Sequence, residues 1–201
     1  MRESLGALLE VHDYGAMLFN TAGAFHRYYR AGMPGCLLLD VRMPRQSGLE
    51  LYEQLLSEGK RLPVIFITAH ADVPTAVAAM KSGAVEFLEK PFDRALLLER
   101  VRRALELDAQ WRSQEAEFSA LTSRVSLLSD RDRETLQMIH AGESNKSMAA
   151  KLFLTERAVE MRRSSLMKKL QVRSVAELVN LTATHRILGE LRQSAGLHRA
   201  R

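Results

Sequence analysis

The sequence predicts two domains of different fold class, an open α/β sheet in its first half and a basic all-α domain in its second. Short apolar runs alternate with helical segments in the first half of the 201 residues. All five prolines lie at or before position 91. Residues 1–108 carry 13 basic and 14 acidic side chains, whereas residues 109–201 carry 16 and 10, so the positive excess belongs to the second half.

The composition excludes several classes of protein. Hydrophobic residues make up 46% of the chain and charged residues 26%, which suits a folded core rather than a disordered chain. No apolar run approaches the roughly 18 residues of a membrane helix, and no secretion leader is expected. The single Cys36 excludes a disulfide framework within the chain and fits a reducing compartment. We therefore expect a cytoplasmic protein that does not enter a membrane.

Four apolar runs of the first half are predicted to be strands. The first three are bounded by Gly, Pro or Asp, and their continuous apolar character is typical of parallel strands that are covered on both faces by helices. The fourth run is the weakest. In chain order, the runs are residues 16–19, 36–39, 64–67 and 86–88.

Helices are predicted between and after these strands. The first covers Arg2 to Val11, and another follows Ser47-Gly48. A third runs from Val73 to Ser82 behind Asp72, a suitable N-cap, and stops at a glycine. Because residues 92–141 contain neither Gly nor Pro, a helix capped by Asp93 is expected to continue to about position 124.

A polar residue stands where three of the predicted strands end. Asp40, Thr68 and Lys90 follow successive apolar runs, and the carboxyl ends of parallel strands meet at one edge of a sheet. A carboxylate can accept a phosphoryl group, and an ammonium and a hydroxyl can stabilise its oxygens. Each residue alone is more readily explained as a strand cap, but the three together favour a site for phosphoryl chemistry.

The segments around Asp40, Thr68 and Lys90 resemble the motifs of a known family. Leu39-Asp40-Val-Arg-Met-Pro44, with Ser47-Gly48-Leu49, resembles the phosphoacceptor loop of bacterial response-regulator receivers. Thr68-Ala69-His70 and Lys90-Pro91-Phe92 resemble later motifs of that family at matching spacing. The resemblance covers most of residues 1–108 and implies a flavodoxin-like receiver with an open parallel sheet.

The resemblance also implies roles for single residues. Asp40 would be the phosphorylated aspartate, Thr68 the switch hydroxyl and Lys90 the lysine that contacts the phosphate. Phe87 falls at the position of the switch aromatic residue.

One departure from the family concerns the first strand. A receiver normally opens with a strand ending in two adjacent acidic residues, which hold Mg²⁺ together with the phosphoacceptor. This sequence opens instead with the predicted helix Arg2–Val11, so the first strand is missing and Asp40 is left alone as a ligand. Either the chain starts upstream of Met1 or the receiver is degenerate. The interpretation is an N-terminally incomplete receiver in which Mg²⁺ at Asp40 is doubtful.

The missing strand would leave a gap in the sheet. In the family's strand order, 2-1-3-4-5, residues 16–19 would lie about 10 Å from residues 36–39, with backbone groups unpaired. The first run could pair directly with the second, the segment before Pro34 could leave its receiver position, or another chain could donate a strand. We expect direct pairing, because Met17 to Phe19 is apolar enough for burial on both faces.

The second half is predicted to contain a helix-turn-helix. A helical linker over residues 109–124, in which Trp111 and Phe118 pack along one helix face, leads into a domain over residues 125–190 and a tail over 191–201. Ser129 and Ser174 open capping boxes. A helix over residues 146–152 and a second over 156–170 are joined by a tight turn. The core side of the second helix is expected to be Val159, Leu166 and Leu170.

The opposite side of the helix over residues 156–170 has the layout of a DNA recognition helix. Between Ser144 and Arg173 the chain carries eight basic and two acidic residues, which makes a merely solvated charged face the less favoured explanation. By position, we expect base edges to be read by Glu160, Met161 and Ser164, and phosphates to be held by Lys146, Thr155, Arg157, Arg162 and Lys168.

This half also resembles the LuxR-type helix-turn-helix of the NarL/FixJ regulators. The resemblance is carried by residues 128–136, 142–149 and 155–159, and by Lys169-Leu170 with residues 173–179. Ala158 and Arg162 depart from the family, which usually has Thr and often His at these positions.

The sequence is therefore interpreted as a DNA-binding transcriptional regulator of a two-component system. Its expected partners are a sensor histidine kinase, double-stranded DNA and a second copy of the chain on a two-fold DNA site. The alternative is a helix-turn-helix regulator with a degenerate receiver that works without phosphorylation. An enzyme of flavodoxin-like fold is least favoured, because no nucleophile–base pair is visible.

Overall fold

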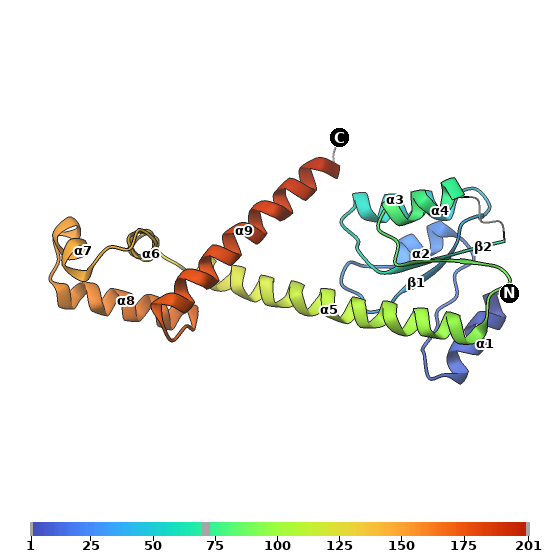
Figure 1. Ribbon diagram of the computed structural model, residues 1–201, viewed down its shortest axis with the longest axis horizontal. Helices are drawn as coiled ribbons and strands as arrows, with labels where there is room; N and C mark the ends of the chain where they lie inside the picture. Colours follow the sequence, from blue (N-terminus) through green and yellow to red (C-terminus); the bar gives the residue numbers. More distant parts are fainter. Residues whose placement is uncertain (1, 70–72, 200–201) are drawn as a thin grey trace. The chain divides into compact units, whose positions relative to one another are not determined.

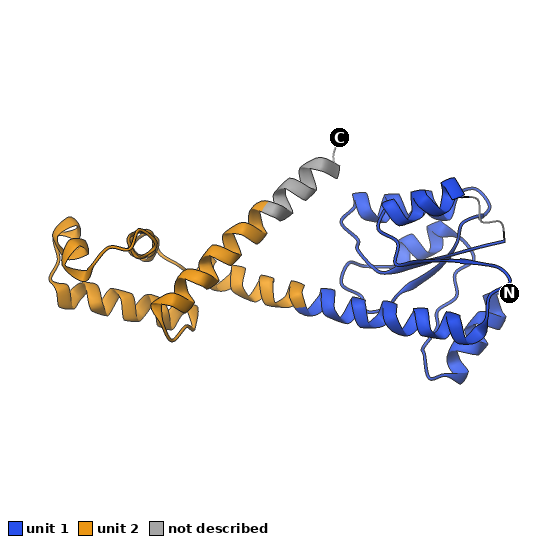
Figure 2. Cartoon of the chain, in the orientation of Figure 1, with its two compact units in different colours: residues 1–113 blue, residues 114–201 orange. Residues whose placement is uncertain are grey.

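The computed structural model describes the backbone of residues 2–69 and 73–199, and side chains through residue 190. The chain divides into two compact units, residues 1–113 and 114–201 (Figure 2). The predicted motif residue His70 and the predicted N-cap Asp72 lie outside the described residues. No helix in the described part of the chain is long and apolar enough to cross a membrane.

The described part of the first unit contains a parallel three-stranded sheet in the order β1-β2-β3. The strands are β1 (Leu37–Asp40), β2 (Val64–Thr68) and β3 (Glu86–Glu89). Leu39 lies opposite Phe66, and Phe66 lies opposite Phe87. The last three of the four predicted strands are thus confirmed, each within one residue of its expected bounds.

Helices cover both faces of this sheet. Val64 and Phe66 belong to a core cluster with α2 (Ala22–Tyr28), α3 (Gly48–Ser57) and α4 (Val73–Lys81). Ile65 points to the other face, in a cluster with α1 (Arg2–Val11) and α5 (Arg94–Ser126). Figure 1 shows α3 and α4 on one side of the sheet and α5 on the other. All residues of β2 are buried, and because their side chains point alternately to the two faces, the strand holds three layers together.

Helix α2 was not predicted from the sequence. Thr21 adopts an extended conformation and its side chain accepts a hydrogen bond from the Ala24 N–H at 3.1 Å, so it is an N-cap. This Thr is the local signal that could have revealed the helix.

The prediction that residues 16–19 form a strand beside β1 is wrong. The segment has no strand structure, and the side chains of Met17 and Leu18 are 60% and 47% exposed. Leu18 lies against α1 at Gly6. The Phe19 ring contacts the rings of Phe25 and Tyr28 at centroid distances of 5.3 and 5.2 Å. Packing against α1 and α2 holds the segment away from the sheet, although it is apolar.

As a result, β1 has an edge that pairs with no strand among the described residues. A hollow of about 750 Å³ runs along this edge, lined by Leu5 and Leu9 of α1, by residues 16–19 and by Leu37–Leu39 of β1. The direct pairing that would have closed the gap does not occur.

The second unit consists of the end of α5 and four further helices, among the described residues. These are α6 (Asp130–His140), α7 (Asn145–Leu152), α8 (Glu156–Leu170) and α9 (Val175–Arg199). The capping box of Ser129 with Asp132 is formed at the start of α6. Val159, Leu166 and Leu170 are fully buried in one cluster, as predicted.

The two aromatic residues of α5 have separate partners. The Arg61 guanidinium lies 4.1 Å from the centroid of the Trp111 ring, inside the first unit. Phe118 stacks on His185 of α9 at 5.2 Å, inside the second unit. The two rings pack against protein, as expected, but each has its partner in a different unit.

Candidate phosphoacceptor site and DNA-binding surface

The sheet brings the three predicted polar residues to one edge. Asp40 is the last residue of β1 and lies opposite Ile67 of β2, one residue before Thr68. Thr68 lies opposite Glu89 of β3, one residue before Lys90. The backbone N–H of Lys90 donates to the Thr68 carbonyl oxygen at 2.8 Å, which continues the ladder beyond β3.

Both carboxylate oxygens of Asp40 have partners. The Lys90 Nζ lies 2.6 Å from Asp40 Oδ2, and the Arg42 backbone N–H donates to Oδ1 at 3.0 Å. The side chains of Asp40 and Lys90 are 30% and 18% exposed. The carboxylate is therefore accessible to a reagent while a cation already stands beside it.

The two predicted switch residues are buried to different extents. Thr68 is fully buried. Phe87 is half-buried and packs against the cluster that contains Phe66 and Ala84. These positions place both residues between the edge of the sheet and the core.

The described residues do not fit a Mg²⁺ centre. Receiver domains typically take Mg²⁺ for phosphorylation, and the ion is held by carboxylates and water. Within the part of the chain that the structure describes, no group of three or more His, Cys, Asp and Glu side chains could hold a metal ion. Asp40 is a single carboxylate whose two oxygens are already hydrogen-bonded.

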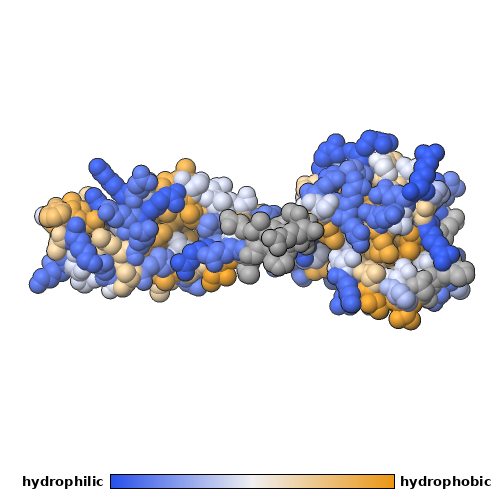
Figure 3. All heavy atoms as spheres, turned by 90° about the horizontal axis from the view of Figure 1, so that it is seen from above, coloured by the Kyte–Doolittle hydropathy of each residue, from blue (hydrophilic) through white to orange (hydrophobic). Residues whose placement is uncertain are grey.

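The predicted DNA-reading face lies on α8 and just before it. Thr155 is the N-cap of α8, and its side chain accepts the Ala158 N–H at 3.2 Å. The face opposite the buried core is exposed, including Met161 at 68%. The exposed candidates are Lys146, Thr155, Arg157, Glu160, Met161, Ser164 and Lys168; Arg162 is half-buried. In Figure 3, hydrophilic side chains cover much of the visible surface of the second unit, with apolar areas between them.

Several basic residues of this domain are already paired within it. Arg162 lies 3.9 Å from Glu134, and Lys169 lies 2.5 Å from Asp132. Lys151 lies 2.8 Å from Glu143. Burial raises the pKa of Asp132, but hydrogen bonds from Lys169 and Ser129 outweigh it and lower the pKa overall. Charge counting from the sequence could not distinguish these paired cations from the cations that have no ion pair among the described residues, such as Lys168.

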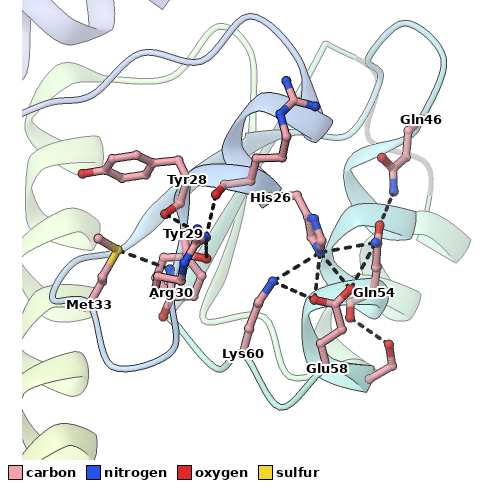
Figure 4. Close-up of polar contacts among 11 residues, drawn as sticks. His26, Tyr28, Tyr29, Arg30, Met33, Gln46, Gln54, Glu58 and Lys60 are labelled. Atoms are coloured by element: carbon pink, nitrogen blue, oxygen red, sulfur yellow. Dashed lines mark hydrogen bonds and ion pairs between the residues drawn. The ribbon is translucent and has the colours of Figure 1, made fainter.

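Sequence reasoning also missed a polar cluster between α2 and the end of α3, drawn in Figure 4. The His26 Nε2 lies 2.8 Å from both Glu58 oxygens, and the Lys60 Nζ lies 2.7 Å from Glu58 Oε2. Hydrogen bonds from Lys60 and then His26 lower the pKa of Glu58 to about 2. The cluster fastens α2, a helix that was not predicted, to α3.

Buried Asp108 of α5 is a further missed residue. It is 4% exposed, and its Oδ2 accepts the Gly35 backbone N–H at 3.1 Å and Arg112 Nε at 2.8 Å. Burial, and then the charge of Asp108, raise the pKa of Cys36 to about 11. The carboxylate ties α5 to the segment that enters β1.

Comparison with known families matches both halves of the chain. Residues 1–102 match the response regulator receiver domain, and residues 126–182 match the bacterial regulatory proteins of the luxR family.

Relatives and solved structures match across both halves. The transcriptional regulatory protein FixJ of Azorhizobium caulinodans is 42% identical over 184 residues, which cover 90% of this chain and 86% of that protein. The response regulator protein TodT of Pseudomonas putida is 38% identical over 180 residues, covering 90% of this chain and 79% of that one. A solved structure of the response regulator StyR has a TM-score of 0.84 and 40% identity, and the match covers 92% of this chain and 93% of that one.

These matches extend over both units, and the named relatives are response regulators and transcriptional regulators. The chain therefore belongs to the NarL/FixJ family of response regulators, in which a receiver domain controls, through phosphorylation, a LuxR-type DNA-binding domain that regulates transcription.

Proposed function

We propose that Asp40 accepts a phosphoryl group from a sensor histidine kinase. The observation that carries this is the 2.6 Å contact between Asp40 Oδ2 and Lys90 Nζ at the carboxyl edge of the sheet. An Asp40 oxygen attacks phosphorus, the bond from phosphorus to the kinase histidine breaks, and the imidazole keeps the electron pair and takes up a proton. The Lys90 ammonium then neutralises charge on the phosphoryl oxygens.

The signal passes from the edge to the core through Thr68 and Phe87. In this proposal, the Thr68 hydroxyl moves to a phosphoryl oxygen, and the half-buried Phe87 ring changes rotamer to fill the space. The burial of both residues supports this, because a buried side chain cannot move without repacking its neighbours.

The output is DNA binding in the cytoplasm by two copies of the chain on a two-fold site. Glu160, Met161 and Ser164 read base edges, while Lys146, Thr155, Arg157, Arg162 and Lys168 hold phosphates. The exposure of the α8 face opposite its buried residues supports this assignment. The chain acts as a regulator and turns over no substrate of its own.

One observation favours the alternative, a regulator that works without phosphorylation. Both oxygens of Asp40 already have hydrogen-bond donors, and the described residues supply no group of three or more side chains that could hold a metal ion. A basic helix-turn-helix needs no phosphate to bind DNA, because its positive charge attracts the DNA backbone directly.

Intact mass spectrometry after incubation with acetyl phosphate distinguishes phosphorylation at Asp40 from the alternative, a regulator that works without phosphorylation. If the proposal is correct, the chain gains the mass of one phosphoryl group, and Asp40→Asn abolishes the gain. Asp13→Asn, which removes a carboxylate outside the sheet, should leave it intact. No mass gain in the unaltered chain, together with undiminished DNA binding, would favour the alternative.

A further inference from the structure

Arg163 is a basic residue of α8 that does not lie on the exposed face. Its side chain is half-buried, and its guanidinium Nη1 donates a hydrogen bond of 2.6 Å to Oδ1 of Asn145. Asn145 is the first residue of α7. The bond therefore joins the two helices of the helix-turn-helix at a fixed point.

This bond also determines which way the Asn145 amide is turned. A guanidinium has only donors, so the atom facing it must be the carbonyl oxygen of the amide and not the nitrogen. The amide nitrogen, Nδ2 of Asn145, has no hydrogen-bond partner among the described residues. Two donor hydrogens are thus left unused beside the amino end of α7.

The surroundings of Asn145 are those of a surface that meets an anion. Lys146 follows it, is exposed, and has no ion-pair partner in the described part of the chain. The other lysine of α7, Lys151, is held by Glu143 at 2.8 Å. Hydrogen bonds from Lys151 and Ser147 lower the pKa of Glu143, so this carboxylate stays charged and keeps its lysine. The unpaired donors of α7 therefore gather at its amino end.

We propose that Asn145 donates its amide N–H groups to the DNA backbone beside Lys146, and that Arg163 is a positioning residue that holds the Asn145 amide in the donating orientation. This inference rests on the proposed DNA-binding function. It adds Asn145, which carries no charge, and it gives Arg163 a role other than direct contact with a phosphate. In a helix-turn-helix the first helix crosses the backbone, so a donor at its amino end meets phosphate oxygens. Arg163 itself then touches no phosphate.

The direct alternative is that Arg163 is one more phosphate contact, as its charge suggests. The two explanations differ in salt dependence. A cation that neutralises a phosphate contributes about 0.9 to the slope of log affinity against log salt concentration, whereas a neutral amide contributes nothing. They also differ in additivity, since a residue that acts only through Asn145 has no effect once Asn145 is gone.

The experiment measures binding of the full chain to a fluorescent DNA duplex of arbitrary sequence over a series of NaCl concentrations. We compare Asn145→Ala, Arg163→Ala, the double variant and Lys146→Ala. Asn145→Ala should weaken binding about tenfold, since a hydrogen bond to a charged group is lost. Arg163→Ala should weaken it by a similar factor or less, and the double variant should match Asn145→Ala within about twofold. Only Lys146→Ala should lower the salt slope by about one.

Asn145→Asp distinguishes this role from a merely structural one. The aspartate still accepts the bond from Arg163, so thermal stability should be unchanged or higher, but it has no N–H to donate and binding should fall at least as far as in Asn145→Ala. Arg163→Lys keeps a donor and should recover part of the binding lost in Arg163→Ala.

Three results would overturn the inference. These are additive losses in the double variant, a lower salt slope in Arg163→Ala, and wild-type binding by Asn145→Asp. If instead the unaltered chain shows no salt-dependent binding to the duplex, the proposed DNA-binding surface itself fails.

Discussion

A Cβ atom on Gly48 would lie 2.3 Å from the backbone carbonyl oxygen of Asp40. Gly48 begins α3, and its N–H donates to the Val41 carbonyl oxygen at 3.0 Å. The glycine thus allows α3 to start against the loop that carries the candidate phosphoacceptor. Any side chain at this position must displace the backbone of Asp40.

Gly48→Ala should therefore destabilise the first unit by about 1–3 kcal/mol, the usual cost of overpacking. It should also slow phosphoryl transfer to Asp40, because the carboxylate moves with its backbone. Urea unfolding followed through Trp111, the single tryptophan of the chain, measures the stability. Gly15→Ala is the matched control, since a Cβ there meets nothing within 4 Å. Equal stability of the two variants would contradict the close approach.

The Glu58 cluster should make stability depend on pH in the acid range. The pKa of Glu58 is about 2 in the folded chain, below its ordinary value of 4.5, so folding favours the charged carboxylate. Its contribution is complete above pH 4.5 and is lost as the pH falls toward 2. Comparing Glu58→Gln with the unaltered chain by thermal unfolding, the stability difference should be largest near pH 7 and shrink below pH 4.5. Glu53→Gln, at an exposed residue of α3, should show no such trend. If both variants show the same dependence of stability on pH, the Glu58 cluster is not its cause.

Asp108→Ala should destabilise the first unit, on the order of 1–3 kcal/mol, because the Gly35 N–H loses its acceptor. Arg112 is 41% exposed and can turn to water, which limits the cost. Asp108→Asn keeps an acceptor for the Gly35 N–H and should lose less. Urea unfolding monitored by circular dichroism measures both variants, and equal losses would assign the effect to the charge instead.

Two neighbouring lysines of α8 should behave differently toward DNA. Both are exposed, but only Lys169 has an ion-pair partner among the described residues, Asp132 of α6 at 2.5 Å. Lys168→Ala should weaken binding about equally across DNA sequences and lower the salt slope by about one. Lys169→Ala removes the same charge but should lower the thermal stability of the second unit more than the salt slope. Identical salt slopes in the two variants would show that the pair with Asp132 opens on DNA.

Glu160→Ala and Ser164→Ala should relax base preference, by roughly 1–3 kcal/mol for each lost reading contact. Competition between duplexes of different sequence measures this effect. If Lys168→Ala alters preference while Glu160→Ala leaves it intact, the assignment of the α8 face is reversed.

The sequence alone was sufficient for features that depend on local pattern. The apolar runs that became β1, β2 and β3 predicted where Asp40, Thr68 and Lys90 meet, because parallel strands end at a common edge. The helical period of α8 separated a buried from an exposed face, since side chains 3.6 residues apart share a side.

Only the tertiary structure decided which predicted strands and which charged side chains have a partner to pair with. Residues 16–19 read as a strand, but a strand also needs a hydrogen-bonding neighbour, and Leu18 and Phe19 pack on α1 and α2 instead. Likewise, the helical period of the sequence placed Lys168 on the exposed face and Lys169 on its flank, but only the packing of α6 against α8 pairs Lys169 with Asp132. Short stretches of sequence determine which side chains are suited to burial and which backbone conformation is favoured. The pairing of residues far apart is set by how the elements pack, which no local pattern contains.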